Sequence, residues 1–158
     1  MKVLVVCLGN ICRSPMAEGI LRKKIIERNL PVTVDSAGTG NYHVGEAPDE
    51  RAITTSLRFG VDISSLAARQ FSINDFDEFD SIFVMDNSNL RNVLDLSRNE
   101  FDAGKVKLML DILYPGEEME VPDPWFGNTE GFVRVFEMLD AASEQLVQEM
   151  EKHFNQKN

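Results

Sequence analysis

A cysteine and an arginine six positions apart are the residues of this 158-residue chain that could most directly carry out chemistry. Cys7 ends an apolar run that begins at Val3, and Arg13 follows a short segment that contains Gly9. A thiolate is a strong nucleophile, and the planar guanidinium fork of an arginine can hold two oxygens of a phosphate. The pair therefore predicts nucleophilic attack on a phosphorylated substrate.

The segment between these two residues favours a loop that binds an anion. Gly9 and Asn10 both tolerate a positive φ, and Ser14-Pro15 is typical of a helix beginning, with the serine as N-cap. A loop between a strand and a helix points backbone N–H groups and the positive end of the helix dipole at one place. These donors and the Ser14 hydroxyl favour the thiolate form of Cys7. We expect the bound phosphate to be surrounded by Leu8, Gly9, Asn10, Ile11, Cys12 and Ser14.

A second segment supplies a candidate general acid. A thiolate that attacks phosphorus must expel an oxygen leaving group, which leaves poorly without a proton. Asp123 stands between two prolines that stiffen its loop, and Trp125 and Phe126 follow it. The two aromatic side chains could form an apolar wall against a substrate ring. An acidic surface turn is the alternative interpretation, and the cysteine loop favours the catalytic one.

The elements that must position these residues alternate between strands and helices. Apolar runs and periodic apolar positions predict strands over 2–7, 32–34, 80–85 and 105–110, helices over 15–29, 48–60, 88–96 and 129–153, a capped turn over 72–77 and a loop over 114–128. This alternation predicts an α/β fold with a parallel sheet and helices on both of its faces. Ligands bind such sheets at the carboxyl ends of the strands, where Cys7 is expected to lie. We expect one domain over 1–158, with its core over about 2–154.

Composition excludes several classes of function. The net charge of −10 argues against nucleic acid or an anionic membrane as a partner. No apolar stretch is long enough to span a bilayer, and the run after Met1-Lys2 is too short for a signal peptide, so we expect a cytoplasmic protein. Two cysteines do not make a disulfide framework, and the cysteines and histidines lack the spacing of metal ligands. We therefore expect no metal.

These segments resemble the low-molecular-weight protein tyrosine phosphatase family. The resemblance rests on segments that follow the family's order over nearly the whole chain: Cys7 to Pro15, Asp35-Ser36-Ala37, Ala68-Arg69-Gln70, Met85-Asp86 with Ser88-Asn89-Leu90, and Asp123-Pro124. It implies a four-stranded parallel sheet of strand order 2-1-3-4, no cofactor, and a phosphotyrosine protein as substrate. We expect a monomer.

The resemblance also implies a two-step mechanism. Cys7 would attack the phosphoryl group and form a phosphocysteine, while Asp123 protonates the tyrosyl oxygen. Asp123 would then activate the water that releases inorganic phosphate. Arg13 would stabilise the transferring phosphoryl group in both steps.

Other positions receive roles from the same resemblance. Asn10 and Ser36 would brace the loop, and Tyr42 would lie beside the substrate ring. Cys12 could trap oxidised Cys7 as a reversible disulfide, or it could simply fill space in the loop.

The chain departs from the family at some positions. Leu66 stands where many relatives carry a histidine that joins the loop-bracing network, and Trp125 and Phe126 replace the tyrosines that some relatives phosphorylate.

Three alternative functions remain open. Arsenate reduction on the same fold passes a disulfide through further cysteines, and this chain has only Cys7 and Cys12. Relatives that act as protein arginine phosphatases carry threonine where this chain has Ile11, and an isoleucine favours an aryl substrate. A non-enzymatic phosphate-binding module would need the loop but neither the thiol nor Asp123.

Overall fold

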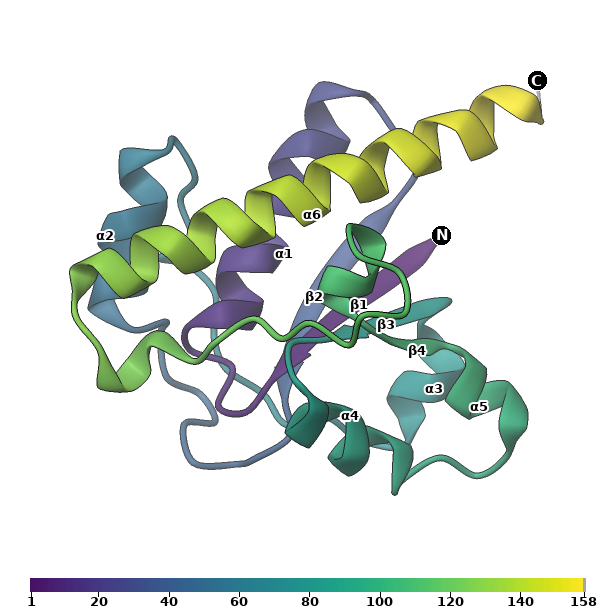
Figure 1. The fold of residues 1–158 in the computed structure, drawn as a ribbon, viewed down its shortest axis with the longest axis horizontal. Coiled ribbons are helices and arrows are strands. Elements are labelled where there is room, and N and C mark those ends of the chain that lie inside the picture. Colours follow the sequence, from purple (N-terminus) through teal and green to yellow (C-terminus); the bar gives the residue numbers. More distant parts are fainter. Residues whose placement is uncertain (158) are drawn as a thin grey trace.

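The computed structural model describes residues 1–157 and contains a four-stranded parallel sheet (Figure 1). Its strands are β1 (Lys2–Cys7), β2 (Thr33–Gly38), β3 (Ser81–Val84) and β4 (Val106–Leu108). They lie in the order β2-β1-β3-β4, so the predicted order 2-1-3-4 is confirmed. The strand order switches next to β1, so the carboxyl end of β1 is the place where sheets of this type bind ligands.

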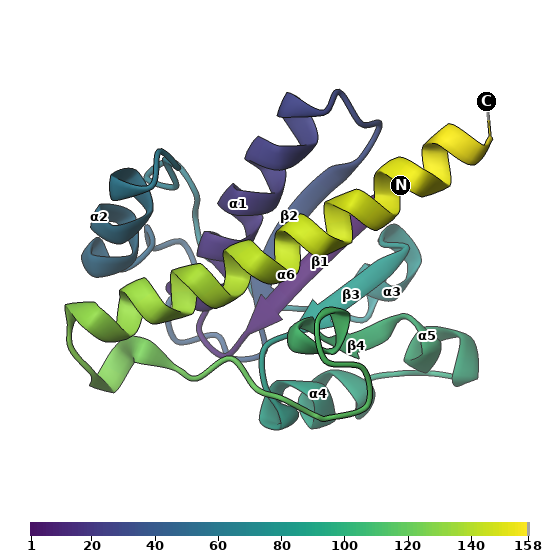
Figure 2. The ribbon, with the colours of Figure 1, turned by 45° about the horizontal axis from the view of Figure 1, so that its top comes forward.

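Helices cover both faces of the sheet, as predicted (Figure 2). One face carries α1 (Arg13–Glu27) and α6 (Thr129–Gln156), with α2 (Glu50–Arg58) packed beside α6, and the other carries α3 (Asn74–Glu78), α4 (Asn87–Leu94) and α5 (Glu100–Gly104). Side chains that alternate along β1 divide between the two cores. Val3 and Val5 pack with α1 and α6, whereas Leu4 and Val6 pack with α3 and α4.

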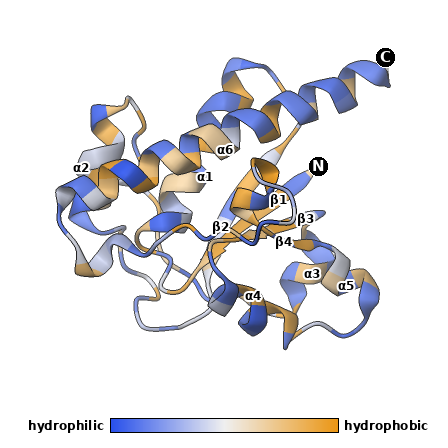
Figure 3. Ribbon diagram, viewed as in Figure 1, coloured by the Kyte–Doolittle hydropathy of each residue, from blue (hydrophilic) through white to orange (hydrophobic). Residues whose placement is uncertain are grey.

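The apolar stripes of α1 and α6 meet over the sheet. The α1 residues predicted for this stripe, Ala17, Ile20, Leu21 and Ile25, are all buried. On α6 the apolar side faces the sheet and the outer side is hydrophilic (Figure 3). The predicted Val133 is only half-buried, and Val135 takes its place in the core. Each large apolar side chain that is fully buried here contributes about 2 kcal/mol.

Several predicted boundaries were wrong. Ser14 is not an N-cap: α1 begins at Arg13, and the serine hydroxyl is hydrogen-bonded inside the loop instead. β2 runs to Gly38, because residues 35–38 pair in register with residues 4–7 of β1. β4 ends at Leu108, where the chain tightens into the 3-10 helix η1 (Met109–Ile112). The structure also adds α5, which was not predicted, and a second short 3-10 helix, η2 (Pro124–Phe126), in the predicted loop.

Among the helices of residues 1–157, none combines the length and the hydropathy needed to cross a bilayer.

Candidate active site

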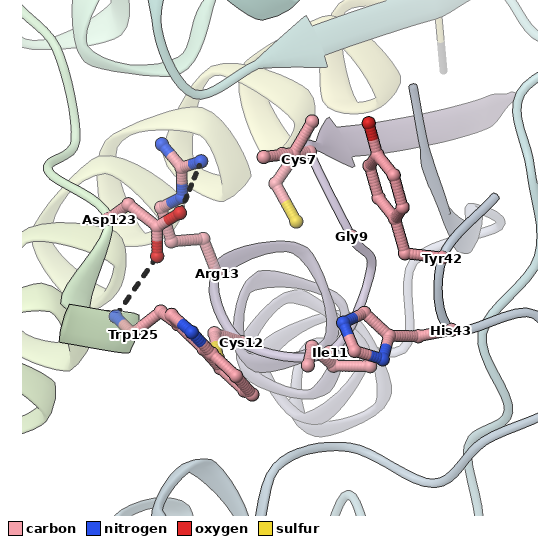
Figure 4. Close-up of a pocket in the computed structure, with 10 residues that line it drawn as sticks. Cys7, Gly9, Ile11, Cys12, Arg13, Tyr42, His43, Asp123 and Trp125 are labelled. Carbon is pink, nitrogen blue, oxygen red and sulfur yellow. Dashed lines mark hydrogen bonds and ion pairs between the residues drawn. The ribbon is translucent and has the colours of Figure 1, made fainter. Parts of the chain in front are cut away.

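A cavity of ≈ 110 Å³ opens at the carboxyl end of β1 (Figure 4). Most of the predicted site residues line it. The lining residues are Cys7, Leu8, Gly9, Ile11, Cys12, Arg13, Tyr42, His43, Asp123 and Trp125. Asp123 is more than one hundred positions from Cys7 in the sequence, and the fold places both side chains at one opening.

Residues 7–14, which we call the anion loop, bend around the sulfur of Cys7. The backbone N–H of Asn10 donates a hydrogen bond to Cys7 Sγ across 3.3 Å. Ser14 Oγ lies 3.1 Å from the same sulfur. Asn10 has a φ of +57°, a left-handed conformation that asparagine tolerates better than most residues. The bend thus points a backbone donor and a hydroxyl at the thiol.

The side chain of Asn10 braces the anion loop from inside the protein. Its Nδ2 donates to Ser14 Oγ across 2.7 Å and to Ser36 Oγ across 2.9 Å. Its Oδ1 accepts a hydrogen bond of 3.0 Å from the backbone N–H of Arg69. Because Ser14 Oγ accepts from the amide, its own proton can point to Cys7 Sγ. The predicted contacts of Asn10 and Ser36 are thus present.

The bracing continues to a buried carboxylate on α1. Ser36 Oγ donates to Glu18 Oε1 across 2.6 Å, and Arg22 Nη2 lies 2.5 Å from Glu18 Oε2. Burial raises the pKa of Glu18, although the hydrogen bond from Ser36 and the charge of Arg22 oppose this shift. Leu66, where the resemblance implies a histidine in many relatives, packs against the core. The bracing network thus reaches from Asn10 through Ser36 to the Glu18–Arg22 pair.

Arg13 is buried and is fixed before any ligand binds. Its Nη1 donates to Asp86 Oδ2 across 2.7 Å and to the carbonyl oxygen of Val121 across 2.9 Å. Burial alone would lower the pKa of Arg13, but the negative charges at Cys7, Asp86 and Asp123 outweigh burial and raise it. The guanidinium is therefore a permanent cation beside the thiol. Sequence reasoning assigned no role to Asp86, and the structure shows that it anchors this arginine.

Residues 121–128, which we call the acid loop, bring Asp123 to the cavity. Its Oδ1 accepts a hydrogen bond of 3.0 Å from the backbone N–H of Trp125, so the aspartate caps η2. Its Oδ2 lies 3.7 Å from Arg13 Nη2. The carboxylate is about one-third exposed and faces the cavity across from Cys7 (Figure 4).

The two aromatic residues of the acid loop differ in position. Trp125 lines the cavity, whereas Phe126 is 90% exposed and lies outside it. A 3-10 helix turns by about one-third of a circle per residue, so neighbouring side chains of η2 face different directions. The prediction that Phe126 forms part of the cavity wall was wrong. Asn10 and Ser14 do not line the cavity either, because their side chains point to the bracing network.

Sequence reasoning missed His43. Its ring lies 5.8 Å from the ring of Trp125 between centroids, and its Nδ1 is 2.6 Å from Glu46 Oε2. It therefore forms the cavity wall between Tyr42 and Trp125. The residue belongs to a loop, where no hydrophobic period could have indicated its direction.

The second cysteine of the loop is chemically distinct. Cys12 is buried, and burial raises the pKa of its thiol well above the ordinary value, with added effects from the charges of Asp49, Cys7 and Asp123. The thiol of Cys12 is therefore neutral at physiological pH. Both cysteines are free in the structure.

Comparison with known proteins agrees with this geometry. The family model described as low molecular weight phosphotyrosine protein phosphatase matches residues 2–156. The chain belongs to this family. The phosphatase is thus a hydrolase of the protein tyrosine phosphatase class, and the expected family is confirmed.

Individual relatives resemble this phosphatase over most of their length. The low molecular weight phosphotyrosine protein phosphatase of Schizosaccharomyces pombe is 43% identical over 83% of this chain and 85% of its own. That of Homo sapiens is 41% identical over 85% and 86%. The crystal structure of a protein tyrosine phosphatase from Entamoeba histolytica, with Hepes in its active site, superposes with a TM-score of 0.90. It is 39% identical and covers 97% of this chain and 98% of its own.

Proposed function

We propose that this phosphatase hydrolyses phosphotyrosine in proteins through a phosphocysteine on Cys7. The observation that carries the proposal is the meeting of three groups at one cavity: a thiol held by loop donors, a fixed arginine cation and a carboxylate. A thiol, a cation and a carboxylate are the nucleophile, the charge stabiliser and the proton donor that this reaction needs.

In the first step the thiolate of Cys7 attacks phosphorus. A sulfur–phosphorus bond forms, the bond from phosphorus to the tyrosyl oxygen breaks, and Asp123 gives its proton to that oxygen. Arg13 and the N–H groups of the anion loop stabilise the charge on the phosphoryl oxygens. The phenol then leaves.

In the second step water attacks the phosphocysteine. Asp123, now a carboxylate, takes a proton from the water as its oxygen binds phosphorus. The sulfur–phosphorus bond breaks, inorganic phosphate leaves, and the thiolate is restored. Each group ends in its starting state. Because side chains supply the nucleophile, the charge stabiliser and the acid–base group, the proposed cycle uses no metal and no cofactor. Because the chemistry needs a reduced thiol, we place the protein in the cytoplasm. We also propose that it acts as a monomer.

The walls of the cavity favour an aryl group. Tyr42, Ile11 and Trp125 present ring and aliphatic surface around the opening. A phenyl ring buries well between such surfaces, whereas a charged guanidinium would lose hydration there. This feature favours phosphotyrosine over phosphoarginine.

A rapid-quench experiment tests the proposal. The enzyme is mixed with ³²P-labelled aryl phosphate, quenched in acid within milliseconds and digested. We expect label on the peptide that contains Cys7, and no label and no turnover in Cys7→Ser, which should still bind phosphate. Turnover without a labelled cysteine would contradict the proposal.

A substrate panel separates the alternatives. p-Nitrophenyl phosphate, a phosphotyrosine peptide, phosphoarginine and arsenate are compared at equal concentration. We expect turnover of the two aryl phosphates and little with the others. Phosphoarginine as the best substrate would favour the arginine phosphatase, and arsenate reduction would favour the reductase.

A further inference from the structure

Arg51, which neither the sequence motifs nor the cavity lining includes, joins α2 to the acid loop. Its Nε and Nη2 hold the two carboxylate oxygens of Asp49, each across 3.0 Å. Its Nη1 donates to the carbonyl oxygen of Gly127 across 3.3 Å. The planar fork therefore binds a carboxylate with one edge and the far end of the acid loop with the remaining nitrogen.

Aromatic contacts add to this attachment. The guanidinium carbon lies 5.4 Å from the ring centre of Trp125 and 4.6 Å from that of Phe132, both within the distance for cation–π attraction. Trp125 belongs to the acid loop, and Phe132 is a buried residue of α6. Arg51 thus holds η2 through the side chain of Trp125 as well as through the carbonyl group of Gly127.

The partner of Arg51 is itself fixed to the anion loop. The backbone N–H of Asp49 donates to the carbonyl oxygen of Ile11 across 2.8 Å. Burial would raise the pKa of Asp49, but its hydrogen bonds to Arg51 outweigh burial and hold it below the ordinary value. The pair is therefore charged at neutral pH. A continuous path runs from Ile11 through Asp49 and Arg51 to Gly127.

The acid loop needs such an attachment at this end. Its beginning is fixed by the backbone bond from Val121 to Met85 and by Arg13. Before its end lies the three-residue helix η2, closed by a single backbone bond from Gly127 to Pro124. The loop then ends at Asn128, which caps α6 by accepting from the backbone N–H of Gly131. One turn of 3-10 helix has little stability of its own. Because Asp123 caps η2, the position of this turn sets the position of the carboxyl group.

We propose that Arg51 is a positioning residue that holds η2 against the anion loop and so places Asp123 for proton transfer. The proposal rests on the proposed function, because it requires Asp123 to be the acid. Arg51 acts through Asp123 and does not contact the phosphoryl group.

The test uses leaving groups of different quality. Nitrophenolate leaves readily without a proton, whereas phenolate needs one. With Arg51→Gln we expect kcat/KM to fall about 10-fold for phenyl phosphate and less than about 3-fold for p-nitrophenyl phosphate, because a small displacement of a catalytic group costs up to about 100-fold. Arg51→Lys keeps the charge opposite Asp49 but lacks the fork, so it should show the same dependence on the leaving group.

Two comparisons make the result specific. In the Asp123→Asn background, Arg51→Gln should cause no further loss, because the group on which it acts is already gone. Arg58→Gln changes an exposed arginine on the same helix and should leave kcat/KM unchanged for both substrates. The inhibition constant of inorganic phosphate should stay within about twofold in every Arg51 variant, since the anion loop is unchanged.

Two results would overturn the inference alone. One is an equal loss of kcat/KM with both substrates in Arg51→Gln. The other is a double variant in which the losses of kcat/KM from Arg51→Gln and Asp123→Asn multiply. Asp123→Asn must itself affect phenyl phosphate more than p-nitrophenyl phosphate. If it does not, the assignment of the acid in the proposed function is overturned together with this inference.

Discussion

The anion loop and the acid loop meet at one cavity, but the protein holds them in different ways. In the anion loop the polar side chains of Asn10, Arg13 and Ser14 are at most 3% exposed. Each makes hydrogen bonds or lies in an ion pair inside the protein. In the acid loop Trp125 is 40% exposed and Phe126 is 90% exposed.

This difference matches what each loop has to do. A dianion is stabilised best by donors that are already in place and shielded from water, where electrostatic interactions are strong. A general acid must give up and regain a proton, which requires access to solvent and substrate. Substitutions in the anion loop should therefore change stability and activity together, whereas those in the acid loop should change activity with little loss of stability.

The largest effect is expected for Arg13→Lys. Lysine keeps the charge but lacks the planar fork, so it has no second nitrogen to bind phosphoryl oxygens while the first bonds Asp86 and the Val121 carbonyl. We expect kcat/KM for p-nitrophenyl phosphate to fall about 10²–10³-fold, the range for loss of a group that stabilises the transition state. Steady-state kinetics measures this. A loss below tenfold would mean that the fork geometry is unimportant.

Asn10→Ala should lower both stability and activity. The substitution removes three hydrogen bonds, two of them buried, and places alanine at a φ of +57°. We expect a loss of about 3 kcal/mol in the free energy of unfolding. Urea denaturation measures it. Asn10→Gly is the matched control, because glycine accepts the backbone conformation and isolates the loss of the side chain. Equal stability of the two variants would exclude backbone strain.

Glu18→Gln should change how stability depends on pH. Because burial raises the pKa of Glu18 in the folded state above its ordinary value of 4.5, folding takes up a proton. The stability associated with this group is fully present below pH 4.5 and is lost as the pH rises through the folded-state pKa. The difference in unfolding free energy between Glu18→Gln and wild type should therefore shift in favour of the variant between pH 4.5 and 7. Urea denaturation at both pH values measures the shift. A constant difference would show that the glutamate does not titrate anomalously.

The smallest effect is expected for Phe126→Ala. A side chain that is 90% exposed contributes little to packing, so the free energy of unfolding should change by less than about 0.5 kcal/mol. Turnover of p-nitrophenyl phosphate should be unchanged, because Phe126 lies outside the cavity. Trp125→Ala, one position earlier, should raise KM for the same substrate. If both variants behave alike, the different orientations of the two aromatics have no effect.

The sequence was most informative where local patterns carry the structure. The strand that ends at Cys7 and the apolar stripe of α1 follow from runs and periods that any window shows. The strand order came from resemblance to a family, since segments far apart in the chain carry no local signal of contact. Asp123 was predicted as the acid from its own segment, because the chemistry of Cys7 requires a proton donor.

The predictions that failed depended on contacts outside the local sequence. A serine before a proline is typical of an N-cap, but here the helix begins at Arg13 and the Ser14 hydroxyl bonds to Asn10 and Cys7 instead. The direction of Phe126 depends on the phase of a single helical turn. The fork of Arg51 on Asp49 joins residues two apart, but its bond to Gly127 spans 76 positions. Such contacts become visible only when the chain is folded.

The anchoring of Arg13 also affects the entropy of phosphate binding. A free arginine side chain samples many rotamers and loses about 2 kcal/mol of entropy when it is immobilised. Here Asp86 and the Val121 carbonyl have already selected one rotamer during folding. The incoming phosphate therefore finds a guanidinium that needs no further ordering, and calorimetry should record a correspondingly small entropic penalty.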